Sequence, residues 1–401
     1  MSLSVLVVNA GSSSLKLRVL GGDDSVRARA DLPALRDDPS AHAELADTIA
    51  ALGPVDAVGH RVVHGGTLYS RPVLVTSEVR RRLEALVDLA PLHQPKSLAA
   101  FDAVSRVLPD VPAVACFDTA FHATIGDAAA TFPLPPEWRA RWTLRRYGFH
   151  GLSHAYTSRR ARELCLPKGG FAPFSNPPHG GTSPPVSPRG APEGPPREPS
   201  APPFRVVTCH LGAGASLAAV ADGASVDTTM SFTPLDGLVM ATRSGSLDPG
   251  LVLWLAEHAR TPPAELAATL ESRSGLAGLT GTADMREVLS RAAAGDAAAV
   301  LGRDVYLHRL RGAIGSMAAA LGGLDALVFT GGVGENSAEI RQRAASGLEF
   351  LGVAVDPARN ASADGAEEYE ISADGAAARS FVIAAREDKE IASQVRSALS
   401  Q

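Results

Sequence analysis

The sequence predicts an α/β protein made of two related halves that face each other across a ligand-binding cleft. Three observations predict this class. Strand patterns alternate with helix patterns, two segments repeat one strand-turn-strand plan, and 401 residues are enough for two or three domains of ordinary size. Apolar residues make up 45% of the chain and charged residues 20%, which is typical of a globular protein with a buried core.

The repeated segments are residues 5–20 and 206–220. Each begins with an apolar strand that ends in a polar residue, Asn9 in the first segment and His210 in the second. A glycine follows two positions later, then a turn of small residues and a second strand. Two matched units far apart in one chain imply a duplicated fold, and a cleft between such halves is where a ligand binds.

The other elements follow from apolar periodicity and from turn residues. Further strands are expected at residues 55–64, 111–118, 204–209 and 324–330. Helices are expected at residues 77–89, 153–166, 250–259, 263–270, 300–321 and 387–399. Strands that alternate with crossover helices place the chain in the α/β class.

Residues 167–203 depart from this pattern, because they contain 13 of the 29 prolines. Proline neither continues a helix nor pairs within a central strand, and this stretch buries too little apolar surface to offset the entropy cost of ordering it. We expect a solvated, disordered surface insertion. A plain linker between two domains is the alternative interpretation.

Charge and cysteine content exclude several classes of protein. The net charge is −5 and no basic stripe is visible, so nucleic acid is not expected as a partner. No signal-peptide pattern or 18-residue apolar run occurs, so we expect a cytoplasmic protein without a membrane partner. Cys116, Cys165 and Cys209 are scattered, which indicates thiols in a reducing compartment and not disulfides or a zinc site.

The turn after the first strand, residues 9–16 (NAGSSSLK), has the chemistry of a phosphate cradle. Glycine lets the backbone approach a ligand, N–H groups and the hydroxyls of Ser12 and Ser14 bind an anion, and Lys16 adds positive charge. Neither a P-loop nor the motif set of protein kinases is present. Taken alone, an ordinary Gly/Ser hairpin explains this turn equally well.

Two further turns have a similar composition, at residues 208–216 (TCHLGAGAS) and 330–337 (TGGVGENS). In the second of these, a buried strand ends in glycines and a helix is expected to begin with Ser337 as its N-cap. Such strand-glycine-helix junctions present backbone donors to phosphates. Three turns of this kind in one duplicated chain are more than hairpins require.

Arginines and histidines gather in three glycine-rich segments, residues 60–66 (HRVVHGG), 145–154 (RRYGFHGLSH) and 240–249 (MATRSGSLDP). Loops of this composition carry function more often than packing. His60 and His64 are four residues apart, but in a strand that spacing separates them by about 13 Å, too far for one zinc ion. The same spacing at His150 and His154 leaves a zinc site open, although no third ligand with suitable spacing lies nearby.

The motifs NAGSSSLK, GHRVVHGG, APLHQP, FDTAFH, RRYGFHG, HLGAGAS, FTPLDGLVMATRSG, TGGVGENS and REDKEIA resemble those of acetate kinases in order and spacing. The resemblance covers nearly the whole chain apart from residues 167–203. It implies the duplicated RNase H-like (actin-like ATPase) fold of the acetate and sugar kinase/Hsc70/actin superfamily, and a homodimer. The implied N-terminal domain comprises residues 1–146 and 386–401, and the nucleotide-binding domain residues 147–385.

The resemblance also implies the reaction, reversible transfer of the γ-phosphoryl group of ATP to acetate with Mg²⁺ or Mn²⁺ present. A carboxylic acid is already ionised at neutral pH, so this nucleophile needs no general base. Catalysis is then expected to depend on placing two anions in line and on neutralising their charge.

Residue roles are carried over position by position. Arg61 would hold the acetate carboxylate, and Arg243 and His150 would stabilise the transferring group. Asp118 matches the catalytic aspartate and is expected to orient Arg61 or the metal shell. The remaining assignments are Asn9 and Glu387 at the metal, Val63, Leu92, His93, Phe149 and Pro234 at the acetate, and Ser12, Ser14, Lys16, His210, Leu211, Gly212, Ala213, Gly214, Asp284, Met285, Arg286, Gly331, Gly332, Val333, Gly334 and Glu335 at the nucleotide.

The chain departs from the family pattern at a few positions, where Gln94 and Ala213 each replace Asn, Ser246 replaces Asp, and Ala385-Arg386 replace Thr-Asn. We expect these changes to alter affinity or substrate choice and to leave the main charged set intact. Two alternatives to an acetate kinase are open. A propionate or butyrate kinase would differ mainly at Val63 and Leu92. An actin- or Hsc70-like nucleotide switch needs no carboxylate pocket, so the Arg61 and Asp118 loops argue against it.

Overall fold

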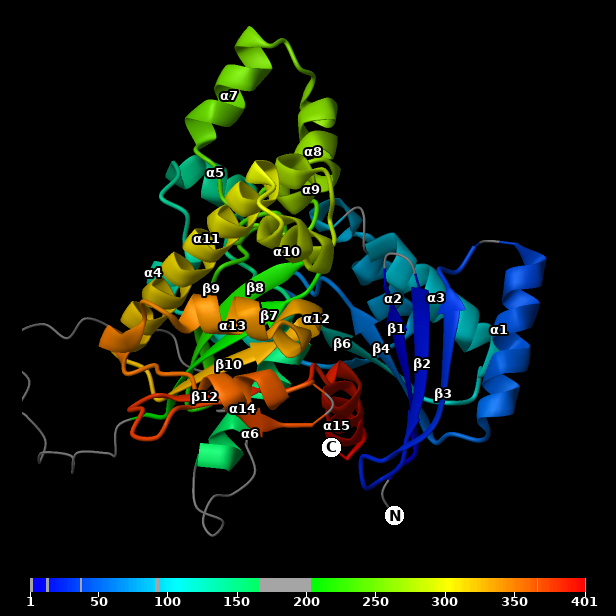
Figure 1. The fold of residues 1–401 in the computed structure, drawn as a ribbon. Coiled ribbons are helices and arrows are strands. Elements are labelled where there is room, and N and C mark those ends of the chain that lie inside the picture. The colour runs from blue at the N-terminus through cyan, green and yellow to red at the C-terminus, as the bar shows by residue number, and fades with distance from the viewer. Residues whose placement is uncertain are drawn as a thin grey trace, which may run out of the picture.

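The computed structural model describes residues 3–11, 14–36, 38–90, 94–165, 203–365 and 367–400. Two six-stranded sheets stand beside each other, and each is covered by helices (Figure 1). The N and C marks both lie in the lower half of the molecule in Figure 1. This is the two-sheet α/β architecture that the repeat predicts.

The first sheet has the strand order β3-β2-β1-β4-β6-β5. Its strands are β1 (Val5–Ala10), β2 (Ser14–Leu20), β3 (Val26–Pro33), β4 (Ala57–Val62), β5 (Val73–Leu74) and β6 (Ala113–Phe117). Strands β1, β4 and β6 run parallel, whereas β2, β3 and β5 pair antiparallel with their neighbours. Helices α1 (Pro39–Leu52), α2 (Ser77–Glu84) and α3 (Gln94–Val107) belong to this half.

The second sheet repeats this topology strand for strand. It comprises β7 (Arg205–Leu211), β8 (Ala215–Ala221), β9 (Ala224–Thr228), β10 (Ala326–Thr330), β11 (Tyr369–Glu370) and β12 (Arg379–Val382), in the order β11-β12-β10-β7-β8-β9. Here β7, β10 and β12 are the parallel trio. The register shift in the pairing of β8 with β9, at Ala219/Val220, matches that of β2 with β3 at Val19/Leu20. The duplicated fold is therefore confirmed.

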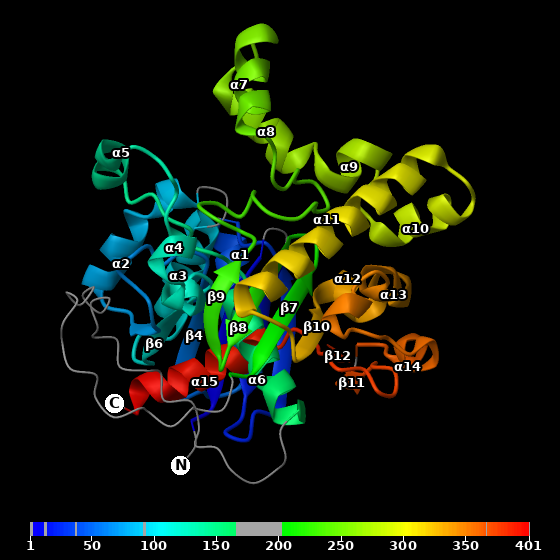
Figure 2. The same cartoon turned by 90° about the vertical axis from the view of Figure 1, so that its left-hand side faces the viewer.

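The other helices are α4 (Asp127–Ala130), α5 (Pro136–Arg141), α6 (Gly151–Cys165), α7 (Pro249–His258), α8 (Pro263–Ser272), α9 (Gly275–Thr280), α10 (Met285–Ala293), α11 (Ala297–Leu321), α12 (Gly331–Asn336), α13 (Ala338–Ala345), α14 (Pro357–Ser362) and α15 (Glu387–Leu399). Helix α11 packs against β7, β8 and β9. Helices α7 and α8 project away from both sheets (Figure 1 and Figure 2).

Helices α6 and α15 pack together between the two sheets. Helix α15 buries Ile391 and Val395 against β1, β4 and β6, and Gly59 on β4 makes room for it, because a Cβ there would lie 2.5 Å from a methyl carbon of Ile391. Helix α6 covers β7 and β10. Arg159 of α6 donates to Glu390 of α15 at 2.7 Å. The C-terminal helix thus shares the core of the first half, although the exact domain boundaries stay a prediction.

The predicted elements exist, with differences at their ends. Helix α15 has the predicted bounds, whereas the helix expected at 77–89 ends at Glu84 and is followed by a 3₁₀ turn, Val87–Leu89. Ser337 caps α13, accepting from the amide of Ile340. The glycines before it, expected as a turn, form the short helix α12.

The proline-rich segment 167–203 lies outside the described residues apart from Pro203. Cys116 and Cys209 are buried free thiols, and Cys165 is half-buried. Among the described helices, none combines the length and apolar character needed to cross a membrane.

Candidate active site

The residues expected at the site meet where the parallel strands of both sheets end. Asn9 and Arg61 are each the last residue but one of β1 and β4, and Asp118 directly follows β6. In the second sheet, His210 is the last residue but one of β7, and Gly331 follows β10. The carboxyl ends of parallel strands are where α/β proteins bind ligands.

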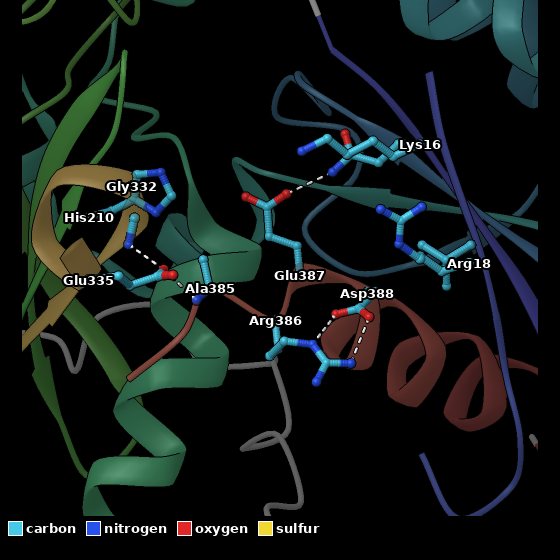
Figure 3. Close-up of a pocket in the computed structure, with 12 residues that line it drawn as sticks. Lys16, Arg18, His210, Gly332, Glu335, Ala385, Arg386, Glu387 and Asp388 are labelled. Atoms are coloured by element: carbon cyan, nitrogen blue, oxygen red, sulfur yellow. Dashed lines mark hydrogen bonds and ion pairs between the residues drawn. The ribbon is translucent and has the colours of Figure 1, made fainter. Parts of the chain in front are cut away.

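A cavity of about 400 Å³ opens between these strand ends. It is lined by residues of both halves, namely Val7, Asn9, Lys16, Arg18, His210, Gly331, Gly332, Glu335, Ala385, Arg386, Glu387 and Asp388. Figure 3 shows Lys16 and Arg18 on one side of the cavity and Glu335 on the other. The sequence repeat predicts a cleft at this place.

Arg61 is held by three side chains beside this cavity. Its Nε and Nη2 donate to Asp118 Oδ2 at 3.1 and 2.7 Å, and its Nη1 donates to Asn9 Oδ1 at 3.2 Å. Nη1 also lies 3.5 Å from Glu387 Oε2. Because Asp118 takes the Nε edge of the guanidinium, one N–H remains on each Nη atom. Two such hydrogens suit the two oxygens of a carboxylate.

The charge states of Arg61 and Asp118 depend on their burial and on their attraction for each other. Burial disfavours the charged form of Arg61, but Asp118 and Glu387 outweigh it and raise the pKa of Arg61 above its ordinary value. Burial raises the pKa of Asp118, although the Arg61 charge and hydrogen bonds act to lower it. Since Arg61 stays charged and donates to both oxygens of Asp118, we assign that carboxylate as ionised at neutral pH.

The loop that carries His150 is fixed through its backbone. His150 has φ of +57°, a left-handed conformation that costs a non-glycine residue about 1–2 kcal/mol. The amide of Gly151 donates to the carbonyl of Asp118 at 2.9 Å, and a Cβ at Gly151 would lie 2.1 Å from that oxygen. Asp118 therefore orients Arg61 with its side chain and positions the His150 loop with its backbone.

Arg243 approaches the same space from the second half. A Cβ placed on Gly214 would lie 3.4 Å from Arg243 Nη1 and 3.4 Å from His150 Nε2, so both side chains border this glycine. Arg243 Nη1 also donates to the carbonyl of Pro234 at 3.2 Å. Burial lowers the pKa of Arg243 below its ordinary value. His150 and Arg243 border a crevice at Gly214, next to the cavity, whose lining includes neither of them nor Arg61. The positive charges of Arg61 and Arg243 both act to lower the pKa of His150.

His150 and His210 stack, with ring centroids 4.3 Å apart and an interplanar angle of 26°. Burial lowers the pKa of His210 to about 4. Burial, with the neighbouring imidazoles and arginines, lowers the pKa of His150 well below its ordinary value. Both imidazoles are therefore neutral at pH 7, and each can donate one hydrogen bond through a ring nitrogen without adding charge.

The second and third glycine turns pack against each other. Gly331 has φ of +76°, and a Cβ there would lie 2.9 Å from the carbonyl carbon and oxygen of Leu211. No other residue fits without moving that backbone. Glu335 Oε1 accepts from the amides of Gly331 and Ala385 at 2.8 Å each. The carboxylate thus ties the third turn to the segment that leads into α15.

The structure describes some of the residues expected around the acetate methyl group. Val63 packs against the buried cluster that contains Phe149, and Pro234 is held beside Arg243. Outside the described residues lie Ser12, Leu92 and His93.

Segment 284–286 is expected at the nucleotide but is not among the residues that line the cavity. Asp284 caps α10, accepts from the amide of Arg286 at 2.9 Å and forms an ion pair with its Nη2 at 2.6 Å. These hydrogen bonds lower the pKa of Asp284 to about 2. Met285 is buried in the core of the second half. A nucleotide contact from this segment stays a prediction.

Two departures from the family pattern have local structural roles. Gln94 is buried, and its amide group accepts from the amide of His64 at 3.2 Å and donates to the carbonyl of His64 at 3.0 Å. It therefore fixes the backbone two residues beyond the end of β4. Ser246 donates to Asp236 at 2.5 Å, so a carboxylate remains in the Arg243 loop.

The other two departures lie nearer the cavity. Arg386 donates from Nε and Nη2 to the two carboxylate oxygens of Asp388, both at 2.8 Å, on the cavity wall. The carbonyl of Ala213 accepts from Ala241 at 3.1 Å, which ties the second turn to the Arg243 loop. The side chain of Ala213 offers no polar group.

The protein ligands for a divalent cation at the cavity are few. Asn9 Nδ2 donates to Glu387 Oε2 at 2.9 Å, and Asn9 Oδ1 accepts from Arg61. Among the described residues, no group of three or more His, Cys, Asp or Glu side chains is placed to hold a metal, and His150 and His154 instead share the hydroxyl of Ser216. One carboxylate and one amide fit Mg²⁺, which keeps several waters and binds through substrate phosphates.

Sequence reasoning missed the polar residues behind the site histidines. The hydroxyls of Ser153, Thr208 and Ser216 lie within hydrogen-bonding distance of ring nitrogens of His210, His154 or His150. Each hydroxyl lies within an otherwise apolar strand or helix face, where periodicity treats it as a small core residue. The sequence signal that could have found them is that Ser153, Thr208 and Ser216 each stand within or beside a motif that contains a histidine.

Comparison with known proteins gives a consistent result. The acetokinase family model matches residues 40–168 and 199–393. The chain is 39% identical to an acetate kinase of Shouchella clausii over 97% of each chain, and 42% identical to one of Microcystis aeruginosa over 89% of this chain and 82% of that relative. A crystal structure of Porphyromonas gingivalis acetate kinase superposes with a TM-score of 0.83, 32% identity and 99% coverage of both chains. A Francisella tularensis propionate kinase gives a TM-score of 0.83 and 32% identity, covering 99% of this chain and 100% of that one.

Proposed function

This chain belongs to the acetokinase family, and we propose that it carries out the family's reaction by direct in-line transfer in the crevice between its halves. It is an ATP:acetate phosphotransferase, which moves the γ-phosphoryl group of ATP to acetate and yields acetyl phosphate and ADP. The observation that supports the mechanism is that Arg61 is held by Asp118 beside the cavity, while His150 and Arg243 border the same glycine, Gly214.

Acetate is already an anion at neutral pH, so no proton has to be removed before it attacks. The two N–H groups that remain on Arg61 bind the carboxylate and fix its direction. One acetate oxygen then forms a bond to the γ-phosphorus while the bond from that phosphorus to the β,γ-bridging oxygen breaks. Asp118, hydrogen-bonded to Arg61, orients the guanidinium and does not act as a base.

Arg243 and His150 border the same glycine, so we place both beside the equatorial oxygens of the transferring group. Charge spreads over these oxygens in the transition state, where fixed donors contribute most. Lys16 and the backbone amides of the second and third turns would bind the nucleotide phosphates. Glu387, with Asn9 beside it, would hold Mg²⁺, which neutralises phosphate charge when bound.

The reaction is tested by trapping acetyl phosphate as its hydroxamate after incubation of the purified protein with acetate, ATP and Mg²⁺. We expect ATP-dependent product, and a pure, folded preparation that makes none would contradict the proposal. Arg243→Ala should lower kcat on the order of a thousandfold with little change in the KM for ATP. Arg311→Ala, on α11, is a matched control outside the crevice.

A propionate kinase of the same family is a second candidate, because its structure matches this chain as well as that of an acetate kinase does. The β-branched side chain of Val63 should keep the acid pocket small. One methylene changes binding by about 1–3 kcal/mol, so we expect kcat/KM to fall from acetate to propionate to butyrate. A larger kcat/KM for propionate would assign the second function.

We further propose a homodimer and a cytoplasmic location. Leu251, Leu253 and Trp254 are exposed on α7, which projects from the molecule (Figure 2). Such an apolar surface suits contact with a second copy. Light scattering should give twice the chain mass, and Leu253→Asp should reduce it. The use of ATP and the buried free thiols suit the cytoplasm.

A further inference from the structure

His150 is connected to the interior by a chain of hydrogen bonds. Its Nδ1 lies 2.8 Å from Ser216 Oγ, which lies 2.8 Å from Nε2 of His154. Nδ1 of His154 lies 2.7 Å from Thr208 Oγ1. His154, Ser216 and Thr208 are completely buried, whereas Nε2 of His150 borders Gly214 at the crevice. The chain of hydrogen bonds therefore leads from strand β7 to the site.

Protons have two consistent arrangements in this chain. A neutral imidazole has one N–H and one bare nitrogen, and a hydroxyl donates once. In the outward arrangement, Thr208 donates to His154, His154 to Ser216 and Ser216 to Nδ1 of His150, so that Nε2–H of His150 points into the crevice. In the inward arrangement every donor and acceptor is exchanged, and the bare Nε2 of His150 points there.

Thr208 decides between the two arrangements. Within the described part of the chain, its hydroxyl hydrogen bonds with His154 alone. The inward arrangement would leave this hydroxyl hydrogen buried without an acceptor, which is costly. The outward arrangement pairs every buried hydrogen of Thr208, His154 and Ser216, and the one hydrogen that it leaves without a protein acceptor, Nε2–H of His150, faces the crevice. The structure therefore favours it.

Two neighbouring histidines follow the same rule. His122 Nε2 lies 3.0 Å from the carbonyl of Phe149, which can only accept, so His122 carries its proton on Nε2. Its Nδ1 lies 2.8 Å from a hydroxyl, that of Ser225. Likewise Nδ1 of His210 lies 2.8 Å from the buried hydroxyl of Ser153. In each case a hydroxyl lies at Nδ1, where it can donate and so allow Nε2 to carry the proton.

We propose that Thr208 and Ser216 act through His154 to hold His150 in the tautomer that presents Nε2–H to the transferring phosphoryl group. A bare nitrogen there would repel the phosphoryl oxygens, whereas the N–H donates to them. Thr208, Ser216 and His154 are positioning residues, because they act through His150 and do not touch substrate. The inference rests on the role proposed for His150 in acetate phosphorylation.

The tautomer is measured directly by ¹⁵N NMR of protein labelled at histidine, since protonated and bare ring nitrogens have distinct shifts. In the free wild-type protein at neutral pH, we expect the proton of both His150 and His154 on Nε2. A His150 proton on Nδ1 would overturn the inference, whatever the activity. A correct tautomer in a protein that forms no acetyl phosphate would count against the proposed function instead.

Thr208→Val removes the hydroxyl at nearly constant volume. We expect a mixture of His150 tautomers and a kcat lowered about tenfold, with the KM values for acetate and ATP unchanged, because the hydrogen bond matters in the transition state. Thr208→Ser keeps a hydroxyl and should restore both the tautomer and kcat.

Thr157→Val is the matched control. Thr157 is equally buried, but its hydroxyl donates to the backbone carbonyls of Ser153 at 2.8 Å and His154 at 3.5 Å and not to a histidine ring. It should leave the His150 tautomer and kcat unchanged. Equal losses in Thr157→Val and Thr208→Val, or no rescue by Thr208→Ser, would overturn the inference. Should Thr208→Val fail to fold, the wild-type spectrum decides alone.

Discussion

The two halves share one topology but carry different chemistry at equivalent positions. Strand β4, central in the parallel trio of the first sheet, carries Arg61 as its last residue but one, and the neighbours of Arg61 are Asp118 and Asn9. Its counterpart β10 ends in Thr330 and leads into Gly331, which packs on the backbone of β7. At these two equivalent strand ends, the first half thus presents side-chain charge and the second presents backbone. Duplication brings the strand ends together, and the residues at those ends determine which substrate each half receives.

The largest effect is expected when the first half loses the planar guanidinium group of Arg61. Arg61→Lys keeps the charge, but an ammonium group cannot form one two-bond contact with Asp118 and a second with the acetate carboxylate. We therefore expect kcat/KM for acetate to fall on the order of a thousandfold. Arg80→Lys is the matched control, because Arg80 makes the same two-bond contact with Asp102 away from the crevice. Comparable losses in the two variants would contradict the role of Arg61.

Asp118→Asn should lower kcat/KM about a hundredfold, because Arg61 loses the anion that orients it. The distinguishing measurement is the pH profile of the remaining activity. We expect the profile to keep its wild-type shape, since Asp118 removes no proton. Activity that instead rises steadily with pH in the variant would assign Asp118 as a general base. Asp102→Asn serves as the control for the loss of an arginine partner.

In the second half, Gly331→Ala should raise the KM for ATP about tenfold and leave the KM for acetate unchanged. The added Cβ would press on the backbone of Leu211 and displace the third turn. Gly322→Ala shares the left-handed φ, at +66°, but has open space around its Cβ position. That variant should lose some stability and no ATP affinity. If Gly331→Ala changed only acetate binding, the assignment of the halves would be reversed.

The smallest effect is expected from the buried histidines, which behave alike in the two halves. Burial lowers the pKa of His64 in the first half and of His210 in the second to about 4. Because these folded-state pKa values lie below the unfolded value, the unfolded chain binds protons that the folded chain does not between about pH 4 and 6.5. The free energy of unfolding should therefore be constant above that range and fall as pH decreases through it. Urea titrations that give equal stability at pH 5 and pH 7.5 would contradict this.

The fold could be predicted largely from the sequence, because both copies of the repeat show the same strand pattern and the same polar residue near the strand end. Two-residue strands such as β5 and β11 carry no periodicity and were not predicted. Helix α12 was missed because its glycines disfavour a helix, and packing of Gly331 on Leu211 overrides that preference.

The site was predictable where its residues end parallel strands, as with Asn9, Arg61 and His210. Thr208 and Ser216 could not be found in this way, since their importance lies in which histidine each one faces. The same limit applies to segment 284–286, whose assignment came only from family resemblance, and which the structure shows as a helix cap with an exposed ion pair.

The central claim is that the ionised acid attacks ATP directly, without a phosphorylated side chain as intermediate. It is tested most directly by the stereochemistry at phosphorus, with ATP made chiral at its γ-phosphoryl group by oxygen isotopes. A single in-line displacement predicts acetyl phosphate with inverted configuration. Retention of configuration would require two successive displacements and would contradict the account.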